Sequence, residues 1–564
     1  MLRPKSNSMR MVLCLDGIWT LKVNNEERPI AVPGSWNEQY QDLCYEEGPL
    51  VYSTDFFVPE KFVDKHIRLY FGAVNTDCVI FINGEKVKEN HIGYLPFEVD
   101  ITGKVRKGKN ELKVVVENHL KMGGFPSKIP EEGTHTVGFL GSFPAANFDF
   151  FPYGGIIRPV MMEFTEHSRI VDVWVDTSES NMEEKLGKVK VKVMVSEEAM
   201  GEEMKITFGG IEKKVKLINT HLEEEFTLRD VKFWSPKVPH LYPLKLEIME
   251  KDEYELEIGI RVISWDEKRL YLNGKPIFLK GFGKHEEFPV LGQGTFYPLM
   301  VKDFNLLKWI NANSFRTSHY PYSEEWLDLA DRLGVLVIDE APHVGITRHH
   351  YNTKTQNLAV ENLKRIIDRD KNHPSVIMWS VANEPESNYP EADKFFKMLY
   401  KTAKNLDRTR PVVMVSMMDT PDERTRDVAL RHFDIICVNR YYGWYVHQGR
   451  IEEGLKALEK DLDELYKRHK KPIFITEFGA DAIAGFHYDP PQMFSEEYQA
   501  ELIKKTVELL MRKDYIIGAH PWAFADFKTP QNVRRPILNH KGVFTRDRQP
   551  KLSAHVLRKL WSNS

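Results

Sequence analysis

The sequence predicts three domains, two β-sandwiches followed by a (β/α)8 barrel, and three observations support this. A chain of 564 residues is too long for one compact core. Up to Ser264, short stretches of alternating apolar and polar residues are separated by turn signals. After Trp265, near-continuous apolar segments alternate with amphipathic helical ones, as in a parallel sheet with crossover helices. We place the domains at 1–167, 168–264 and 265–564.

The first domain is predicted to be a β-sandwich of the jelly-roll type. His66–Phe71 and Glu111–Glu117 alternate as strands do. The pair Asn83-Gly84 separates two further strand-like stretches, and both residue types tolerate the positive φ of a tight hairpin turn. Many short strands with tight turns favour a sandwich.

The second domain is predicted to be an immunoglobulin-like sandwich. Lys188–Val195, Met204–Phe208 and Leu244–Ile248 have the period-two pattern of strands, and about a hundred residues pass without a helix signal. The paired cysteines of antibody domains are absent from this segment.

The third domain is predicted to be a (β/α)8 barrel, with an open doubly wound sheet as the lesser alternative. Amphipathic helices are expected at Leu299–Asn311, Ser323–Gly334, Ser495–Lys513 and Lys551–Trp561. Eight strand–helix units in about 290 residues fit such a barrel. The eight expected strands are Pro276–Gly283, Ser314–Pro321, Val335–Pro342, Val376–Pro385, Val412–Met418, Ile435–Gly443, Pro472–Ala480 and Gly518–Phe527.

Composition excludes several classes of protein. The net charge of −4 offers no general attraction to nucleic acid or to anionic membranes, so neither is an expected partner. No stretch approaches the apolar length that a bilayer requires, and the start of the chain is polar and basic, which makes a cytoplasmic location the default. We interpret the four cysteines, Cys14, Cys44, Cys78 and Cys437, as small buried apolar residues rather than as a disulfide framework.

Two glutamates follow apolar strands where a barrel places its active site. Glu384 ends the fourth expected strand and Glu477 the seventh. Two carboxyl groups suffice for glycoside hydrolysis, because one protonates the leaving oxygen and the other attacks the anomeric carbon or activates water. The alternative is that both are isolated charges at the mouth, solvated or paired with arginines. Two such residues, one of them preceded by Asn383, favour catalysis.

The motifs resemble those of a known family. Asn383-Glu384-Pro385 with Glu477-Phe-Gly479 resembles clan A glycosidases, and the order of domains resembles glycoside hydrolase family two. Over nearly its whole length the chain looks like the β-glucuronidase group of that family, most specifically in the segment Asn539–Arg548. The Asn-x-Lys pair in this segment, Asn539 and Lys541, marks enzymes that handle a sugar carboxylate.

The resemblance implies a role for each matching residue and a homo-oligomeric state. Glu384 would be the acid/base, Glu477 the nucleophile of a retaining mechanism, and Asn383 a donor to the sugar 2-hydroxyl. Tyr441 would donate to the nucleophile and keep it ionised. The other implied substrate contacts are Asn439, Tyr445 and Trp522 at the glucuronate ring, Asn539 and Lys541 at its carboxylate with Arg535 nearby, and Asp149 and His319 at the sugar hydroxyls.

Two alternatives remain: a β-galactosidase or β-mannosidase of the same family, and a catalytically inactive carbohydrate-binding protein. Against the first, a cation with a neutral donor two residues away suits a monoanionic carboxylate, and a neutral sugar would leave a buried Lys541 without a partner. Against the second, a binding module needs no acid paired with a nucleophile. The sequence has neither a dinucleotide-binding nor a Walker motif, so we expect no cofactor and no metal.

Overall fold

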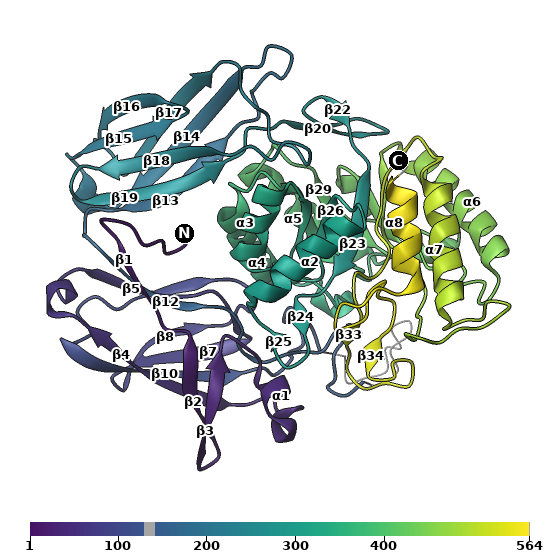
Figure 1. Cartoon of the computed structure of the whole chain (residues 1–564), viewed down its shortest axis with the longest axis horizontal. Coiled ribbons are helices and arrows are strands. Elements are labelled where there is room, and N and C mark those ends of the chain that lie inside the picture. Colours follow the sequence, from purple (N-terminus) through teal and green to yellow (C-terminus); the bar gives the residue numbers. More distant parts are fainter. Residues whose placement is uncertain (129–141, 563–564) are drawn as a thin grey trace.

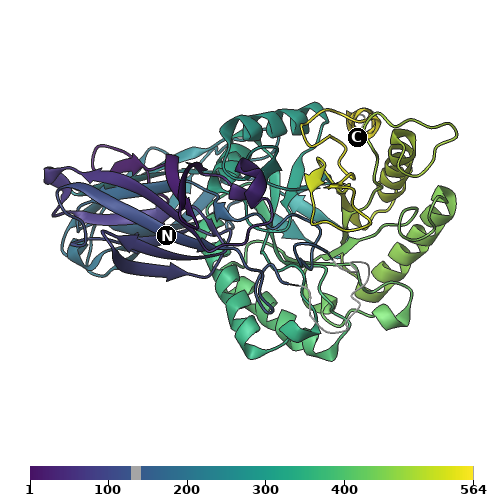
Figure 2. The same ribbon diagram turned by 90° about the horizontal axis from the view of Figure 1, so that it is seen from below.

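The computed structural model describes residues 1–128 and 142–562 and contains two β-sandwiches on one side of a barrel (Figure 1). A view turned by 90° shows the same separation, with the sandwich strands at one end of the molecule and the barrel at the other (Figure 2). No helix among these residues has the length and apolar character needed to cross a membrane.

The first sandwich consists of two antiparallel sheets that enclose one apolar core. Asn83 and Gly84 both have positive φ (51° and 85°) in the turn between β7 (Asp77–Ile82) and β8 (Glu85–Asn90), so the predicted hairpin is confirmed. One sheet has the order β1 (Met11–Cys14), β12 (Val160–Thr165), β5 (His66–Phe71), β9 (Phe97–Asp100). The other has the order β3 (Glu26–Val32), β2 (Gly17–Val23), β4 (Leu50–Val58), β10 (Gly108–Glu117), β7 (Asp77–Ile82), β8 (Glu85–Asn90). The short helix α1 (Trp36–Gln39) and the strand pair β6 (Val74–Asn75) and β11 (Gly155–Ile156) complete this domain.

The second sandwich has three strands in one sheet and four in the other, as expected for an immunoglobulin-like domain. The inward residues of the predicted strands, such as Val191, Ile206 and Leu246, are fully buried. The sheets are β13 (Ile170–Asp176), β14 (Gly187–Val195), β17 (His221–Leu228), and β16 (Ile211–Lys216), β15 (Glu203–Phe208), β18 (Tyr242–Ile248), β19 (Asp252–Ile258).

Eight parallel strands close into a barrel, which confirms the predicted fold. Every residue of β26 to β32 in this barrel is buried, as expected of strands covered on both faces. The strands are β23 (Leu279–Lys284), β26 (Ser314–Thr317), β27 (Leu336–Glu340), β28 (Val376–Asn383), β29 (Val412–Ser416), β30 (Ile436–Asn439), β31 (Ile473–Glu477) and β32 (Ile516–Ala519). Most of them end earlier than the sequence predicted, because the residues after the strands leave the sheet to build the mouth.

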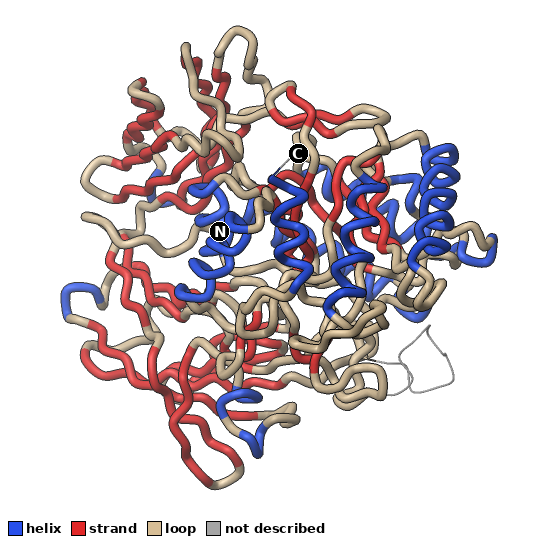
Figure 3. Tube along the Cα trace, turned by 45° about the vertical axis from the view of Figure 1, so that its right-hand side comes forward, coloured by secondary structure: helices blue, strands red, loops and turns tan. Residues whose placement is uncertain are grey.

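Helices surround these strands (Figure 3). The residues at their ends are typical helix caps. The side chain of Ser495 caps the first turn of α7 (Glu496–Leu510), and Gly334 adopts a left-handed conformation (φ 72°) after α3 (Glu324–Leu333). The helices are α2 (Tyr297–Trp309), α3 (Glu324–Leu333), α4 (Thr353–Asp370), α5 (Pro390–Leu406), α6 (Ile451–His469), α7 (Glu496–Leu510) and α8 (Leu552–Ser562). Short sheets flank the barrel: β20 (Ile263–Trp265) with β21 (Leu270–Leu272) and β22 (Lys275–Pro276), β24 (Glu287–Phe288) with β25 (Gly292–Gln293), and β33 (Phe527–Lys528) with β34 (Leu538–Asn539).

Buried and partly buried contacts hold the three domains together. The N-terminal segment inserts Leu2 into the core of the second sandwich, and Arg3 binds Asp328 of the barrel at 2.9 Å. Arg10, which is 2 % exposed, donates to Asp252 of the second sandwich at 2.7 Å. Loops of the first sandwich also join the barrel core, where Tyr94 stacks on Tyr320 with a centroid separation of 4.5 Å.

The interpretation of the cysteines is partly wrong. Cys78 and Cys437 are buried, but Cys14 is exposed and Cys44 is half-buried. Cys14 ends the edge strand β1, whose side chains are only partly covered. All four thiols are free.

Candidate active site

The two candidate catalytic glutamates lie at the same mouth of the barrel because they follow parallel strands. Glu477 is the last residue of β31, and Glu384 comes directly after β28. Asn439 ends β30 and is paired with Glu477 in the sheet. Glu384 has a positive φ of 47°, an uncommon conformation for a residue with a side chain that is often found at functional sites.

The environment of Glu384 favours its neutral form. Burial and, after it, the negative charge of Glu477 raise the pKa of Glu384 to about 8, although a hydrogen bond from Asn439 opposes the shift. Asn439 Nδ2 lies 2.7 Å from Glu384 Oε1. At neutral pH this carboxyl group therefore carries a proton that it can donate.

Glu477 accepts hydrogen bonds from two side chains. The Tyr441 hydroxyl donates to Oε2 at 2.8 Å, and Arg316 Nη2 donates to Oε1. Two donors, one of them cationic, are suitable partners for a carboxylate that acts as a nucleophile. The two glutamates therefore have the opposed environments that an acid and a nucleophile require.

Arg316 and Glu340 form a buried support that sequence reasoning missed. Arg316 Nη1 lies 2.8 Å from both carboxylate oxygens of Glu340, and neither side chain is exposed to solvent. Glu340 Oε1 also lies 2.8 Å from His319 Nδ1, and the imidazole stacks on Trp522 at 5.0 Å. The available signal was a charged residue in a buried strand, namely Arg316 in β26 and Glu340 at the end of β27.

Asn383 joins the two halves of the site. Its Oδ1 accepts from Arg316 Nη1 at 3.3 Å and from Asn439 Nδ2 at 3.4 Å. Asn439 and Arg316 contact Glu384 and Glu477 respectively, so a continuous set of hydrogen bonds links the acid to the nucleophile.

The residues of the expected carboxylate clamp lie together, and each has a partner within the protein. Asn539 and Lys541 are buried, at 0 % and 1 % exposure. Asn539 Nδ2 donates to Asp149 Oδ2 at 2.6 Å, and Arg535 Nε lies 3.0 Å from the same oxygen. Lys541 Nζ lies 2.5 Å from Asp481 Oδ2. The expectation that Lys541 would have no partner without a sugar carboxylate is therefore wrong.

Aromatic side chains border this clamp. The hydroxyl of Tyr445 accepts a hydrogen bond from Arg535 Nη2 at 2.8 Å. The centroid of the Tyr445 ring lies 5.0 Å from Lys541 Nζ. Tyr445 is 44 % exposed, so one face of it remains open to solvent. The rings of Tyr441 and Tyr445 are in contact, with centroids 5.2 Å apart, which places the clamp next to the nucleophile.

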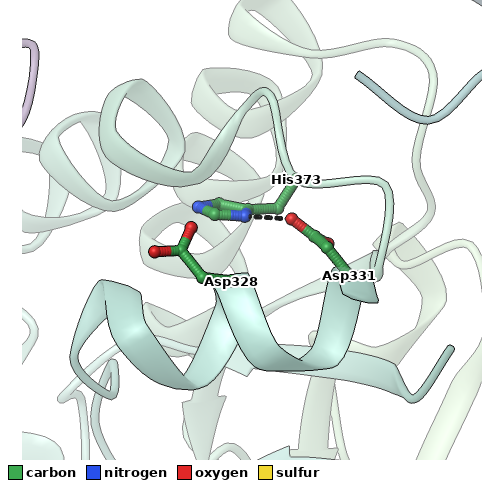
Figure 4. Close-up of side chains that lie close together, drawn as sticks. All are labelled: Asp328, Asp331 and His373. Carbon is green, nitrogen blue, oxygen red and sulfur yellow. Dashed lines mark hydrogen bonds and ion pairs between the residues drawn. The ribbon is translucent and has the colours of Figure 1, made fainter. Parts of the chain in front are cut away.

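A second group of acidic residues and a histidine is structural. Asp328 and Asp331 project from α3 toward the imidazole of His373 (Figure 4). His373 Nδ1 lies 2.6 Å from Asp331 Oδ2, and Asp328 is already paired with Arg3. His373 precedes β28, at the end of the barrel opposite the mouth, where residues serve stability rather than catalysis.

A pair of carboxyl groups, one with a raised pKa and one held by donors, at the ends of the fourth and seventh strands of a barrel suits glycoside hydrolysis. Three models of the glycosyl hydrolases family 2 match the chain: its sugar binding domain over residues 9–165, a second model over 164–261 and its TIM barrel domain over 263–564. The chain therefore belongs to glycoside hydrolase family 2.

Several known proteins that are similar to the chain over nearly its whole length are β-glucuronidases. A β-glucuronidase of Paenibacillus borealis is 39 % identical, covering 100 % of this chain and 98 % of its own. The structure of a Dictyoglomus thermophilum β-D-glucuronidase is 39 % identical with a TM-score of 0.92, covering 100 % and 99 % of the two chains. That of a Bifidobacterium dentium β-glucuronidase complexed with coumarin-3-O-glucuronide is 34 % identical with a TM-score of 0.94, covering 100 % and 98 %.

Proposed function

We propose that the chain is a retaining exo-β-glucuronidase, which hydrolyses terminal β-D-glucuronides to glucuronate and an aglycone. One observation carries the choice of sugar. Asn539, Lys541 and Arg535 bring a buried amide and two cations to the wall of the site next to Glu477. Such a group suits a carboxylate on the sugar that Glu477 attacks. The relatives at 34–39 % identity are β-glucuronidases, which supports the same choice.

The two environments assign the steps of a double displacement. Glu384 gives its proton to the glycosidic oxygen while Glu477 attacks the anomeric carbon, so the aglycone leaves as a neutral alcohol and a glycosyl–enzyme ester forms. Glu384, now a carboxylate, takes a proton from a water molecule that attacks the same carbon and releases Glu477. Two inversions give net retention of configuration, and Glu384 regains its proton.

The remaining site residues have positioning roles in this proposal. Asn383 donates from its amide to the sugar 2-hydroxyl, because its oxygen is already used as an acceptor. Tyr441 donates a hydrogen bond to Glu477 and positions it for attack, and Trp522, stacked on His319, packs against one face of the sugar ring. Asp149 and His319 accept or donate at sugar hydroxyls, while Asn439 and Tyr445 border the ring.

The alternative function is a glycosidase that acts on a neutral sugar, and the role of the clamp residues must distinguish the two. Because Asp481 already compensates Lys541, the lysine alone does not rule it out. The discriminating experiment measures kcat/KM for aryl β-glucuronide and aryl β-glucoside in the wild type and in Lys541→Ala. A charge-assisted hydrogen bond contributes about 1.5–3 kcal/mol, so we expect a loss of about 10- to 150-fold on the glucuronide and little change on the glucoside.

A matched variant separates the clamp from the general cost of losing a buried lysine. Lys371 is also buried, at 9 % exposure, and is paired with Asp368 at 2.6 Å at the end of the barrel opposite the mouth. Lys371→Ala should lower both activities together through stability. If Lys541→Ala behaves in the same way, the clamp is structural and the sugar specificity must be sought elsewhere.

The location and assembly of the protein complete the proposal. A cytoplasmic protein is supported by four free thiols, one of them the exposed Cys14, which suits a reducing compartment. A homo-oligomer follows from the family resemblance, and light scattering on the purified chain tests it. The expected substrates are small-molecule or oligosaccharide glucuronides, with no nucleic acid or membrane as partner.

A further inference from the structure

Asp481 contacts both cations of the clamp and has no part in the catalytic steps. It lies four residues after Glu477, at 3 % exposure. Its Oδ2 lies 2.5 Å from Lys541 Nζ and 3.4 Å from Arg535 Nη1. Its Oδ1 accepts the backbone N–H of His540 at 2.9 Å, which lies between Asn539 and Lys541 in the chain. One carboxylate therefore holds the backbone and both charges of the clamp.

The surroundings of Lys541 are poorly suited to a charge without such a partner. The rings of Tyr441, Trp444 and Tyr445 have centroids 5.9, 5.3 and 5.0 Å from Nζ, and the side chain is 1 % exposed. Aromatic faces stabilise an ammonium by less than water does, so a buried ammonium at this position needs a carboxylate partner, and Asp481 contacts it.

Lys284, another lysine of this barrel, shows how strongly burial lowers the pKa of a lysine. Lys284 is 1 % exposed, lies over the ring of Trp326 at 3.9 Å and is 3.2 Å from Asp303. Burial lowers the pKa of Lys284 to about 8 even with that carboxylate beside it. A lysine in similar surroundings with no carboxylate would lose its proton at a lower pH still.

The net charge of the clamp shows that Asp481 also weakens the attraction for a sugar carboxylate. Lys541 and Arg535 are matched by Asp481 and Asp149, so the clamp is neutral before a sugar carboxylate arrives. Asp149 comes from the first sandwich and also binds Asn539. A carboxylate directly on Lys541 weakens the attraction of a second anion. The presence of Asp481 at this contact therefore points to a further role for it.

We propose that Asp481 is a positioning residue for the carboxylate clamp, which keeps the Lys541 ammonium charged and in place until the sugar carboxylate binds. The proposal rests on the proposed glucuronidase function. In Asp481→Asn we expect the buried Lys541 to lose its proton at a lower pH than in the wild type and then to donate only weakly to the sugar carboxylate. Selectivity for glucuronate would then depend on pH.

The test is the inhibition constant of D-glucuronate as a function of pH in Asp481→Asn, with D-glucose as the neutral probe. Asparagine keeps the size and an acceptor for His540 N–H but removes the charge. We expect the ratio of variant to wild-type inhibition constants for glucuronate to rise by at least about tenfold between pH 6 and pH 9, the range into which burial brings a lysine. The corresponding ratio for glucose should stay constant. Because both constants include the titration of Glu384, that contribution cancels in the ratio.

Two further variants make the result interpretable. Asp303→Asn removes the partner of the other buried lysine and should leave the glucuronate ratio independent of pH. Asp481→Glu keeps the charge but moves it by one methylene, so its ratio for glucuronate should be raised equally at all pH values. If Asp481→Asn does not fold, the Asp481→Glu profile decides: no change, or a pH-dependent change, overturns the proposal.

The outcomes also separate this inference from the proposed function. A pH-independent ratio in folded Asp481→Asn, or equal losses for glucose and glucuronate, overturns the role of Asp481 alone. A wild-type protein that neither hydrolyses glucuronides nor is inhibited by glucuronate overturns the proposed glucuronidase function, on which this inference rests.

Discussion

The raised pKa of Glu384 makes a quantitative prediction for the pH dependence of catalysis. The perturbation is pH itself, because the proposed acid must be protonated when the substrate binds. Burial and the charge of Glu477 raise the pKa of Glu384 to about 8. For a poor leaving group such as phenol, kcat/KM should therefore be constant up to neutral pH and fall about tenfold per pH unit above 8.

The size of the effect follows from the shift. At pH 7 a group with a pKa of 8 is about 90 % protonated, whereas an unperturbed glutamic acid with a pKa of 4.5 would be about 0.3 % protonated. The environment thus supplies a factor of roughly 300 in the concentration of the active form. If Glu384 is the acid, activity at neutral pH should depend strongly on this factor.

The assay compares phenyl β-glucuronide with 2,4-dinitrophenyl β-glucuronide from pH 5 to pH 10. The second leaving group departs without a proton, so the part of the alkaline fall that is due to Glu384 should be absent. Glu384→Gln should lower kcat/KM for the phenyl substrate by about 10²–10⁴-fold and abolish its alkaline fall. Equal falls for both substrates, or a fall for the phenyl substrate centred near pH 5, would refute the assignment of Glu384.

Three further results are expected. A 2-fluoro-glucuronyl inactivator should label the peptide that contains Glu477 in mass spectrometry, and NMR should show a β-configured first product; a label elsewhere or an α product removes Glu477 from its role. Tyr441→Phe loses the 2.8 Å hydrogen bond to the nucleophile and should lower kcat/KM by about 10- to 150-fold with the melting temperature nearly unchanged, whereas a purely structural tyrosine would give the opposite pattern. Asp331 raises the pKa of His373 to about 9 against the effect of burial, so the pair adds stability that is complete below pH 6.5 and is lost as pH rises through 9. His373→Gln should therefore lower the melting temperature much more at pH 6 than at pH 10, and an equal loss at both would contradict the linkage.

The fold could be predicted because its signals are local. Period-two strands, the Asn83-Gly84 turn and the apolar runs of the barrel are each legible within about ten residues. The two glutamates could also be predicted, since a charge at the carboxyl end of a buried strand such as β28 or β31 has few reasons to be there other than function.

The interactions that tune the site could not be predicted because their partners are remote in sequence. Asp481 and Lys541 are 60 residues apart, and Arg316 and Glu477 are 161 apart. No periodicity links such positions, and the protonation of Glu384 depends on burial that only tertiary packing creates. The resemblance to family two named the clamp residues, but it did not reveal that a carboxylate already holds Lys541.

The contact of Asp149 with Arg535 and Asn539 means that the proposed active site does not belong to one domain. In the proposed mechanism the barrel supplies the reacting carboxyl groups, while the first sandwich supplies a carboxylate that contacts the clamp. An isolated barrel would leave the Arg535 guanidinium without its nearest carboxylate, and a chimera that joined this barrel to a foreign sandwich would inherit that defect. In this enzyme the unit that can be exchanged, by recombination or by design, is the barrel together with the loop that carries Asp149.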